Sequence, residues 1–325
     1  MTFDDAFVEK PLWIRGVSAT EDEPWLSAAP GSTNVFAGSV YLEAPIGDLT
    51  LPSDAALVFR KATTFGGLAY FRCGTIRIAE GGTFNCGTGS GLYLYSGARL
   101  ELAGKAEGKF RFSGGAVELF DGGSITNATG YLTASSSLTL NGHDVHFVFF
   151  DHDWGTFTIS STAPARFIVG YDGNNPHSDV SASTLVGCIS FVKNGTGGSL
   201  TLKAGGYAST GDLTVEGSGT MVLADGATWR NGTNVNVRGS GVLRLDGRRQ
   251  FNGQVTVLNL AGSGVVQVAD GTTQRVHAMT VDGAPVPPGL YGSADAPGVD
   301  TTYAAHFTGT GVVRVGSPGA MLIIR

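Results

Sequence analysis

Short alternations of apolar and polar residues run along most of the chain, and each ends at glycine, asparagine or aspartate. Residues 75–78, 116–119, 199–202 and 242–245 are four examples. An alternation with a period of two predicts a β-strand that buries one of its faces. No sustained helical pattern of apolar residues accompanies these runs. The sequence therefore predicts an all-β fold built from very short strands.

Strands this short need neighbours of the same kind. A strand of about four residues buries about two side chains, which do not offset the entropy lost on ordering it. Stacked in register on near-copies, the same strands form one continuous core. Corners such as Gly81-Gly82 and Asp225-Gly226 supply the positive φ angles that tight bends require. We therefore expect a single right-handed parallel β-helix. A β-sandwich is the alternative, because the Asp-Gly and Asn-Gly pairs also fit hairpin turns.

The ends of the chain differ from its middle. Residues 51–275 carry the short alternations and predict coils of about 20–25 residues each. Residues 1–50 contain four prolines and two tryptophans and predict an N-terminal cap, while the proline-rich residues 276–325 predict a C-terminal closing unit. A solenoid needs such caps because its open ends expose backbone groups and core. We expect these three parts to form one structural domain.

Composition narrows the choice of partners. The chain has 50 glycines among 325 residues and a net charge of -6, with no basic cluster in the sequence, so we expect no nucleic-acid partner. No apolar run approaches the roughly 20 residues of a membrane helix, so we expect no membrane insertion. The three cysteines, at 73, 86 and 188, are too few for a disulfide scaffold and predict buried free thiols, although one disulfide remains open.

One stretch carries a family resemblance. Residues 189–215 contain a lysine (Lys193), a glycine-bracketed turn, a Leu-Thr-Leu strand at 200–202, a tyrosine (Tyr207) and a second strand at 213–215. This order resembles the autotransporter-associated β-strand repeat. The segments 281–283, 288–292 and 309–315 resemble the closing unit that often follows such repeats in large secreted bacterial proteins. The resemblance implies a secreted or surface-exposed parallel β-helix with further repeat or catalytic domains attached.

The architecture is also similar to a β-helical carbohydrate-binding module attached to bacterial xylanases. The start of the chain shows no apolar core of a signal peptide, which favours a module excised from a larger protein. A rigid surface that binds sugars needs exposed aromatic rings beside polar side chains. The candidates are aromatic residues near polar ones, for which a core or corner position is the competing interpretation: Trp154, Tyr171, Trp229, Tyr93, Tyr95, Asp151, His152, Asp153 and Asn174.

The sequence patterns that would indicate catalysis or metal binding are weaker than those for sugar binding. Glu80, Glu101 and Glu118 are spaced near one coil apart, so a ladder of carboxylates is open, but outward solvated glutamates explain the spacing as well. Histidines and aspartates gather in residues 143–153 without a diagnostic ligand spacing, and a polar corner explains them. We therefore predict no catalytic residue, no metal ligand and no cofactor.

The sequence thus predicts a non-catalytic carbohydrate-binding module for plant cell-wall polysaccharide, with xylan as the first candidate, from a secreted bacterial protein. Two alternatives remain. One is a surface passenger, adhesin or spacer rod, which needs no aromatic binding surface. The other is a β-helix polysaccharide lyase or hydrolase, which needs carboxylates that converge on the substrate.

Overall fold

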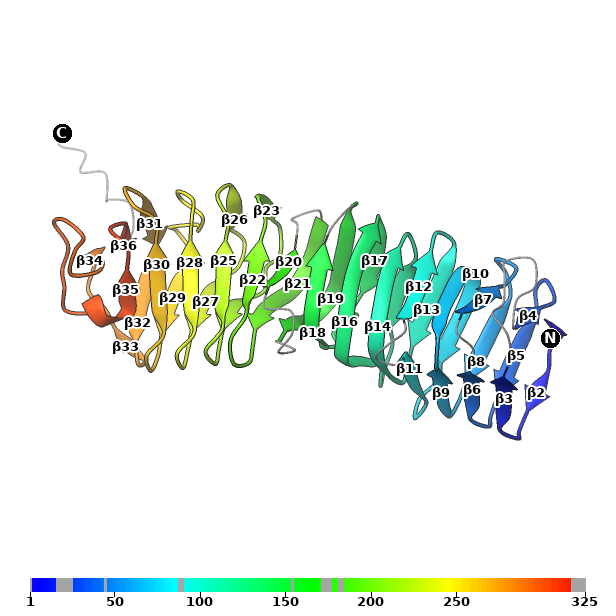
Figure 1. Ribbon diagram of the computed structural model, residues 1–325. Coiled ribbons are helices and arrows are strands. Elements are labelled where there is room, and N and C mark those ends of the chain that lie inside the picture. Colours follow the sequence, from blue (N-terminus) through cyan, green and yellow to red (C-terminus); the bar gives the residue numbers. More distant parts are fainter. Residues whose placement is uncertain are drawn as a thin grey trace. The chain divides into compact units, whose positions relative to one another are not determined.

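The computed structural model describes residues 2–15, 26–43, 46–86, 91–152, 155–170, 177–180 and 184–316. Its strands stack in parallel to form a β-solenoid of about 11 turns (Figure 1). The predicted all-β parallel β-helix is therefore confirmed over the β-sandwich. Contacts divide the chain into two compact units, Met1–Ala165 and Arg166–Arg325, here named the N-terminal and the C-terminal unit.

The N-terminal unit consists of short strands, several of which continue around a corner of the coil. Its strands, with β19 passing into the C-terminal unit, are β1 (Thr2–Phe3), β2 (Phe7–Val8), β3 (Leu12–Arg15), β4 (Ser27–Ala28), β5 (Thr33–Phe36), β6 (Val40–Glu43), β7 (Ile46–Thr50), β8 (Ala56–Phe59), β9 (Ala62–Phe65), β10 (Leu68–Ile78), β11 (Thr83–Cys86), β12 (Gly91–Tyr95), β13 (Ala98–Leu102), β14 (Lys105–Ser113), β15 (Ala116–Leu119), β16 (Ser124–Ala134), β17 (Ser136–Thr139), β18 (Val145–His152) and β19 (Phe157–Val169).

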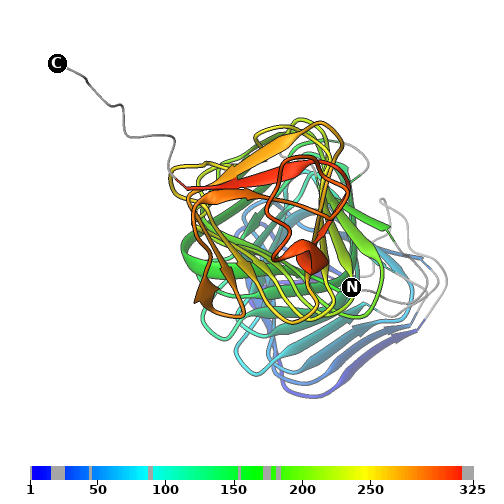
Figure 2. The ribbon, with the colours of Figure 1, turned by 90° about the vertical axis from the view of Figure 1, so that its left-hand side faces the viewer.

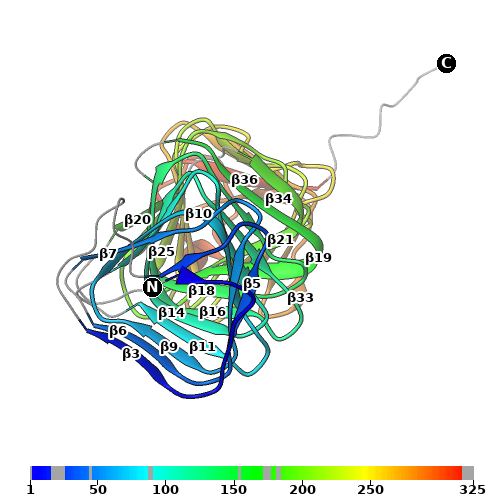
Figure 3. The ribbon, with the colours of Figure 1, turned by 90° about the vertical axis from the view of Figure 1, so that its right-hand side faces the viewer.

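Each coil of the N-terminal unit adds one strand to each of three parallel faces, and Figure 3 shows these coils nested one behind another. The first face holds β5, β8, the end of β10, β13, β15, β17 and the start of β19. The second holds β3, β6, β9, β11 and the starts of β14, β16 and β18. The third holds β7, the start of β10, β12 and the ends of β14, β16 and β18.

The core lies inside the coils as columns of apolar side chains in register. On the first face one column is at most 1% exposed and consists of Leu57, Ile76, Leu100, Val117, Leu138 and Ile159. Phe36 stacks on Phe59 with ring centroids 5.1 Å apart. Each inward side chain is thus covered by the coils on both sides, which supplies the apolar burial that a single short strand lacks.

The C-terminal unit repeats this construction with shorter strands, and Figure 2 shows its coils, drawn in green to red, around a common outline. Its elements after β19 are β20 (His177–Val180), β21 (Thr184–Lys193), β22 (Ser199–Leu202), β23 (Gly205–Tyr207), β24 (Leu213–Val215), β25 (Thr220–Leu223), β26 (Ala227–Trp229), β27 (Asn234–Val237), β28 (Val242–Leu245), β29 (Val257–Leu260), β30 (Val265–Val268), β31 (Thr273–Val276), β32 (Ala278–Val281), β33 (Ala284–Pro285), β34 (Gly289–Tyr291), the 3-10 helix η1 (Ala304–His306), β35 (Phe307–Thr308) and β36 (Val312–Val315).

Lys193 and Tyr207, which carry the repeat-like pattern, both hydrogen-bond to backbone carbonyls in this unit. Lys193 is buried, and its Nζ donates hydrogen bonds of 2.9 Å to the carbonyl oxygens of Gly170 and Asn194. The hydroxyl of Tyr207 donates to the carbonyl oxygens of Val180, at 2.7 Å, and Lys203, at 3.1 Å. Both side chains therefore satisfy backbone carbonyls at coil corners, where the strand ladder leaves them without a partner.

Parallel coils extend on both sides of residues 51–275. Before this range, β5 pairs with β8 and β6 pairs with β9, both in parallel. After it, β36 pairs in parallel with β31. Two antiparallel pairs, β32 with β33 and β34 with β36, accompany this last coil. An antiparallel strand reverses the chain without adding a further coil, which suits a closing unit.

Substitutions at two glycines with positive φ, Gly81 and Gly108, would show how closely neighbouring coils approach one another. A Cβ atom at Gly108 would lie 1.8 Å from the carbonyl oxygen of Cys86 in the coil before it, whereas one at Gly81 would meet nothing within 4 Å. We expect Gly81→Ala to cost about 1 kcal/mol through its positive φ alone. Gly108→Ala should cost at least about 2 kcal/mol more, because the coils must move apart. Urea unfolding measures both, and equal losses would contradict close coil contact at Gly108.

Lys193 gives a pH-dependent test. Burial lowers the pKa of Lys193 to about 8, whereas an unfolded lysine has a pKa of about 10.4. Between these values the unfolded chain holds a proton that the folded chain has lost, so stability rises with pH over this window. We expect the wild type to gain stability relative to Lys193→Met between about pH 8 and about pH 10. Urea unfolding of both proteins at several pH values measures the difference, and a constant difference would refute the lowered pKa.

Candidate functional site

Several predicted sugar-binding residues cannot be placed. Trp154, Asp153, Tyr171 and Asn174 lie outside the described residues. The backbone of His152 ends β18, but its side chain lies outside the described part of the chain. The role predicted for these five residues stays a prediction. Three of the remaining candidates, Tyr93, Tyr95 and Asp151, lie on the third face of the N-terminal unit, as set out below.

The prediction that Trp229 presents its ring to a sugar is wrong. Its side chain is fully buried in the C-terminal unit. Its ring centroid lies 5.8 Å from that of Phe191 and 6.0 Å from that of Tyr207. In the three-residue strand β26, Ala227 and Trp229 both point inward, so the tryptophan fills the core at a coil corner. Only the outer residue Thr228 separates them.

Tyr93 and Tyr95 alternate with Leu92 and Leu94 along β12. Both leucines are buried, and both tyrosines are half-buried on the outside of β12. In register with Tyr93 stands Tyr70 of the preceding coil, and Arg111 of β14 stands on its other side. A single column of outward side chains therefore follows the coil axis on the third face.

The same column continues into further coils. Arg111 is in register with Tyr131 of β16, which is in register with Asp151 of β18. At the other end, Tyr70 is in register with Asp48 of β7. We name the tyrosines on this face, with the cations that lie against them, the tyrosine strip: Tyr70, Tyr93, Tyr95, Tyr131, Arg72, Lys109 and Arg111.

The rings of the strip contact each other both across coils and within β12. The ring centroids of Tyr70 and Tyr93 are 5.0 Å apart, and those of Tyr93 and Tyr95 are 6.2 Å apart with planes 16° from parallel. Tyr131 contacts the ring of Phe149 at 5.4 Å. Such contacts add about 0.5–1.5 kcal/mol per pair beyond burial and fix the orientation of each ring.

Cations lie between the rings. The Arg111 guanidinium is 4.9 Å from the centroid of Tyr93 and 5.0 Å from that of Tyr131, so it lies against both tyrosines. Arg72 approaches the ring of Tyr95 to 5.1 Å, and Lys109 approaches that of Tyr131 to 4.9 Å. Cation–π attraction holds these charged groups over the rings.

A buried carboxylate anchors one end of the strip. Asp48 is 1% exposed, and its carboxylate accepts hydrogen bonds from Arg72 Nε at 2.8 Å and from Thr50 Oγ1 at 2.6 Å. Burial raises the pKa of Tyr95 and lowers the pKa of Lys109. The Tyr95 hydroxyl therefore stays a protonated donor at neutral pH. The strip combines ordered rings, phenol hydroxyls and guanidinium groups, which are suited to hydrogen-bonding hydroxyl-rich ligands.

Five members of the strip were not predicted from sequence: Tyr70, Tyr131, Arg72, Lys109 and Arg111. Tyr70, Arg111 and Tyr131 are each about one coil of roughly 20 residues from their partner in register. Aligning the outward positions of successive coils is the signal that finds them. Arg72 stands at a shift in the register between β10 and β7, between Phe71 and Cys73. No sequence pattern predicts that shift, so Arg72 could not have been found in this way.

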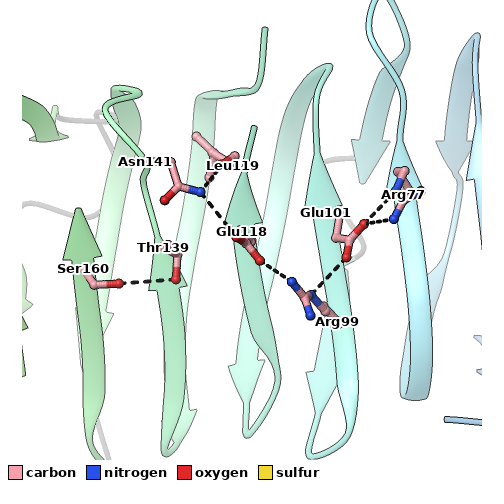
Figure 4. Close-up of polar contacts among 8 residues, drawn as sticks. All are labelled: Arg77, Arg99, Glu101, Glu118, Leu119, Thr139, Asn141 and Ser160. Carbon is pink, nitrogen blue, oxygen red and sulfur yellow. Dashed lines mark hydrogen bonds and ion pairs between the residues drawn. The ribbon is translucent and has the colours of Figure 1, made fainter. Parts of the chain in front are cut away.

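The predicted carboxylate spacing exists in part. Glu101 and Glu118 are neighbours in register on the first face, whereas Glu80 is exposed in a turn. Arginines form ion pairs with both glutamates, as Figure 4 shows. Arg77 Nε donates a hydrogen bond of 2.6 Å to Glu101, and Arg99 pairs with both Glu101 and Glu118. This ladder of alternating charges stabilises the first face. Its carboxylates face arginines rather than a cleft.

The cysteines at 73, 86 and 188 are free thiols, and burial raises the pKa of Cys86. Within the described ranges, no three histidine, cysteine, aspartate or glutamate side chains gather as a metal site would require. His143 lies 3.7 Å from Asp121, and burial lowers the pKa of His146. The described residues also contain no helix that is long and apolar enough to cross a membrane.

The fold defines this chain as a parallel β-solenoid protein. No protein-family model matches it, and neither a curated protein nor a solved structure does. The resemblances to the autotransporter-associated repeat and to the β-helical carbohydrate-binding module therefore stay predictions, and function must be argued from the surface itself.

The charge ladder gives a stability test. Glu101 is 7% exposed and paired with two half-exposed arginines, so Glu101→Gln should cost about 1–2 kcal/mol of unfolding free energy. Glu80→Gln is the matched control and should stay within about 0.5 kcal/mol. Urea unfolding measures both variants. If Glu101→Gln were as harmless as Glu80→Gln, the ladder would have no structural role.

Proposed function

We propose that this chain is a non-catalytic polysaccharide-binding β-solenoid whose ligand lies along the tyrosine strip. The expected ligand is a plant cell-wall polysaccharide, with xylan as the first candidate. The expected setting is a secreted or surface-exposed bacterial protein with further domains attached. The single observation that carries the proposal is the column Tyr70, Tyr93, Arg111 and Tyr131, in register over four coils.

The chemistry of the strip suits a sugar chain. A sugar ring has apolar C–H faces that pack on aromatic rings and hydroxyls that need donors and acceptors, and tyrosine offers both. Ring contacts and Arg111 hold Tyr93 and Tyr131 in place before a ligand binds, so binding costs little side-chain entropy. The coils repeat at about 4.8 Å, which is comparable to the length of one sugar unit in an extended chain. Successive sugars can therefore meet successive coils.

The two alternatives gain less support. A passenger or spacer needs no ordered column of tyrosines and cations on one face. A lyase or hydrolase needs carboxylates directed at the substrate, whereas Glu101 and Glu118 are engaged by Arg77 and Arg99. Neither alternative explains why Arg72, Lys109 and Arg111 all lie against tyrosine rings.

Affinity gel electrophoresis on xylan, mixed-linkage glucan and pectin tests the proposal. We expect xylan or mixed-linkage glucan to retard the protein, whereas retardation by pectin supports the strip only where the tyrosine substitutions abolish it. Tyr93→Ala and Tyr131→Ala should each weaken binding about tenfold, as for buried aromatic anchors of other interfaces. Phe120→Ala is the control, because Phe120 is 38% exposed in the turn after β15 rather than on the third face.

The outcomes separate the alternatives. Thermal unfolding of each variant establishes that its fold is intact before binding is compared. Binding that survives both tyrosine substitutions would place the ligand elsewhere, and failure of every polysaccharide to retard the wild type would refute the proposal. Release of unsaturated or reducing ends from any of the polysaccharides would favour the lyase or hydrolase.

A further inference from the structure

A second charged surface lies in the C-terminal unit and shares no residue with the tyrosine strip. Five arginines line two adjoining grooves of about 350 Å³ and 400 Å³, which share two of these residues. We name them the arginine row: Arg230, Arg248, Arg249, Arg275 and Arg314. Four of the five are exposed, and Arg275 is half-buried. Their guanidinium groups are thus available to a ligand.

The row follows the stack of coils. Arg230 comes directly after β26, whose Trp229 pairs with Phe251 of the next coil. Arg248 and Arg249 precede Phe251 in that next coil. The backbone beyond Phe251 lies against Arg275, because a Cβ atom at Gly253 would be 2.8 Å from the Arg275 Cβ. Four successive coils therefore each contribute at least one arginine.

The last two members stand in direct register. Arg275 of β31 is the parallel partner of Arg314 of β36, with both side chains on the outer side of their strands. Leu290 of β34 pairs with Arg314 and is 40% exposed, so it adds an apolar contact at the edge of the second groove. The row thus has an apolar margin beside its charges.

The charges of the row are not neutralised within the described part of the chain. No ion pair or hydrogen bond joins the side chains of its five arginines to any described residue. The nearby Asp246 pairs with Arg244, and Asp270 accepts hydrogen bonds from Thr310. Gathering five like charges costs free energy unless an anion offsets it. This gathering occurs in a chain whose net charge is -6.

We infer that the arginine row binds a polysaccharide whose sugar units carry carboxylate groups, that is, a uronic-acid polymer. A guanidinium group matches a carboxylate with two parallel hydrogen bonds. The coil repeat of about 4.8 Å brings one cation per sugar length, which fits a polymer with one charge per sugar. Double-stranded DNA, which carries one phosphate charge per strand for about every 3.4 Å of helix axis, fits this spacing poorly, and the net negative charge of the protein repels it.

This inference goes beyond the proposed function, because it names another site, in the other unit, and another class of ligand. Neutral polysaccharide at the tyrosine strip needs no arginine of the row. Uronate polymer at the row needs no tyrosine of the strip. Each can fail without the other.

The test compares polygalacturonate with a neutral arabinoxylan in affinity gels and by calorimetry, using the complete chain. The double variant Arg275→Gln and Arg314→Gln should raise the Kd for polygalacturonate at least about tenfold, because it removes two charge-assisted contacts. Arg238→Gln, an exposed arginine after β27 outside both grooves, is the matched control and should bind as the wild type does. Binding should also weaken steeply as salt is raised.

Further measurements separate the other outcomes. Tyr93→Ala should leave polygalacturonate binding unchanged if the row is the site. Polygalacturonate binding that is absent, or that persists in the double variant with thermal stability intact, would overturn the inference. Equal or tighter binding of dextran sulfate or single-stranded DNA would also overturn it, because the row would then be a general anion site rather than a uronate site.

Discussion

The in-register stacking of short strands is the constraint on which both surfaces depend. The register that places Leu92 of one coil on Phe110 of the next also places Tyr93 on Arg111. Because side chains alternate along a strand, a shift by one residue would turn the apolar column outward and the polar column inward. The core therefore fixes the outer surface. The register of the inward column therefore also sets which outward residues stand beside one another in successive coils.

Other outward columns also place polar side chains beside one another in successive coils, where they form hydrogen bonds or ion pairs. In the C-terminal unit, Asn236 donates to Thr214, Asn259 donates to Asn236, and Thr280 donates to Asn259, which makes a ladder of hydrogen bonds across four coils. In the N-terminal unit, alternating arginines and glutamates make a ladder of ion pairs (Figure 4). Both ladders satisfy their members internally. The two proposed binding surfaces differ from these ladders. In the tyrosine strip, Lys109 and Arg111 lie against tyrosine rings, and in the arginine row no described acid pairs with the guanidinium groups.

Local sequence predicts this fold well and its surfaces only in part. The alternation in residues such as 91–95 is enough to assign an inner and an outer side, and Tyr93 and Tyr95 lie where that alternation puts them. The prediction for Trp229 is wrong because a strand of three residues has too few positions to establish which side faces inward. The polar residues near it in the sequence suggested a position on the surface. Partners in neighbouring coils, such as Tyr70 and Tyr131, cannot be assigned from local sequence, because the number of residues between positions in register differs from coil to coil. Ser113 and Ala134, for example, follow a shift in register.

The electrostatics of the two surfaces explain why one chain would present both. In the tyrosine strip, Arg72 is neutralised by the buried Asp48, and the remaining cations lie against rings, so the surface is suited to hydroxyls more than to charge. In the arginine row, no described acid pairs with the guanidinium groups, so an anion is the ligand that relieves their repulsion. Plant cell-wall material contains both neutral and uronic-acid chains. Two surfaces of different charge on one kind of scaffold would let the protein hold both, since the coils set the same repeat for each.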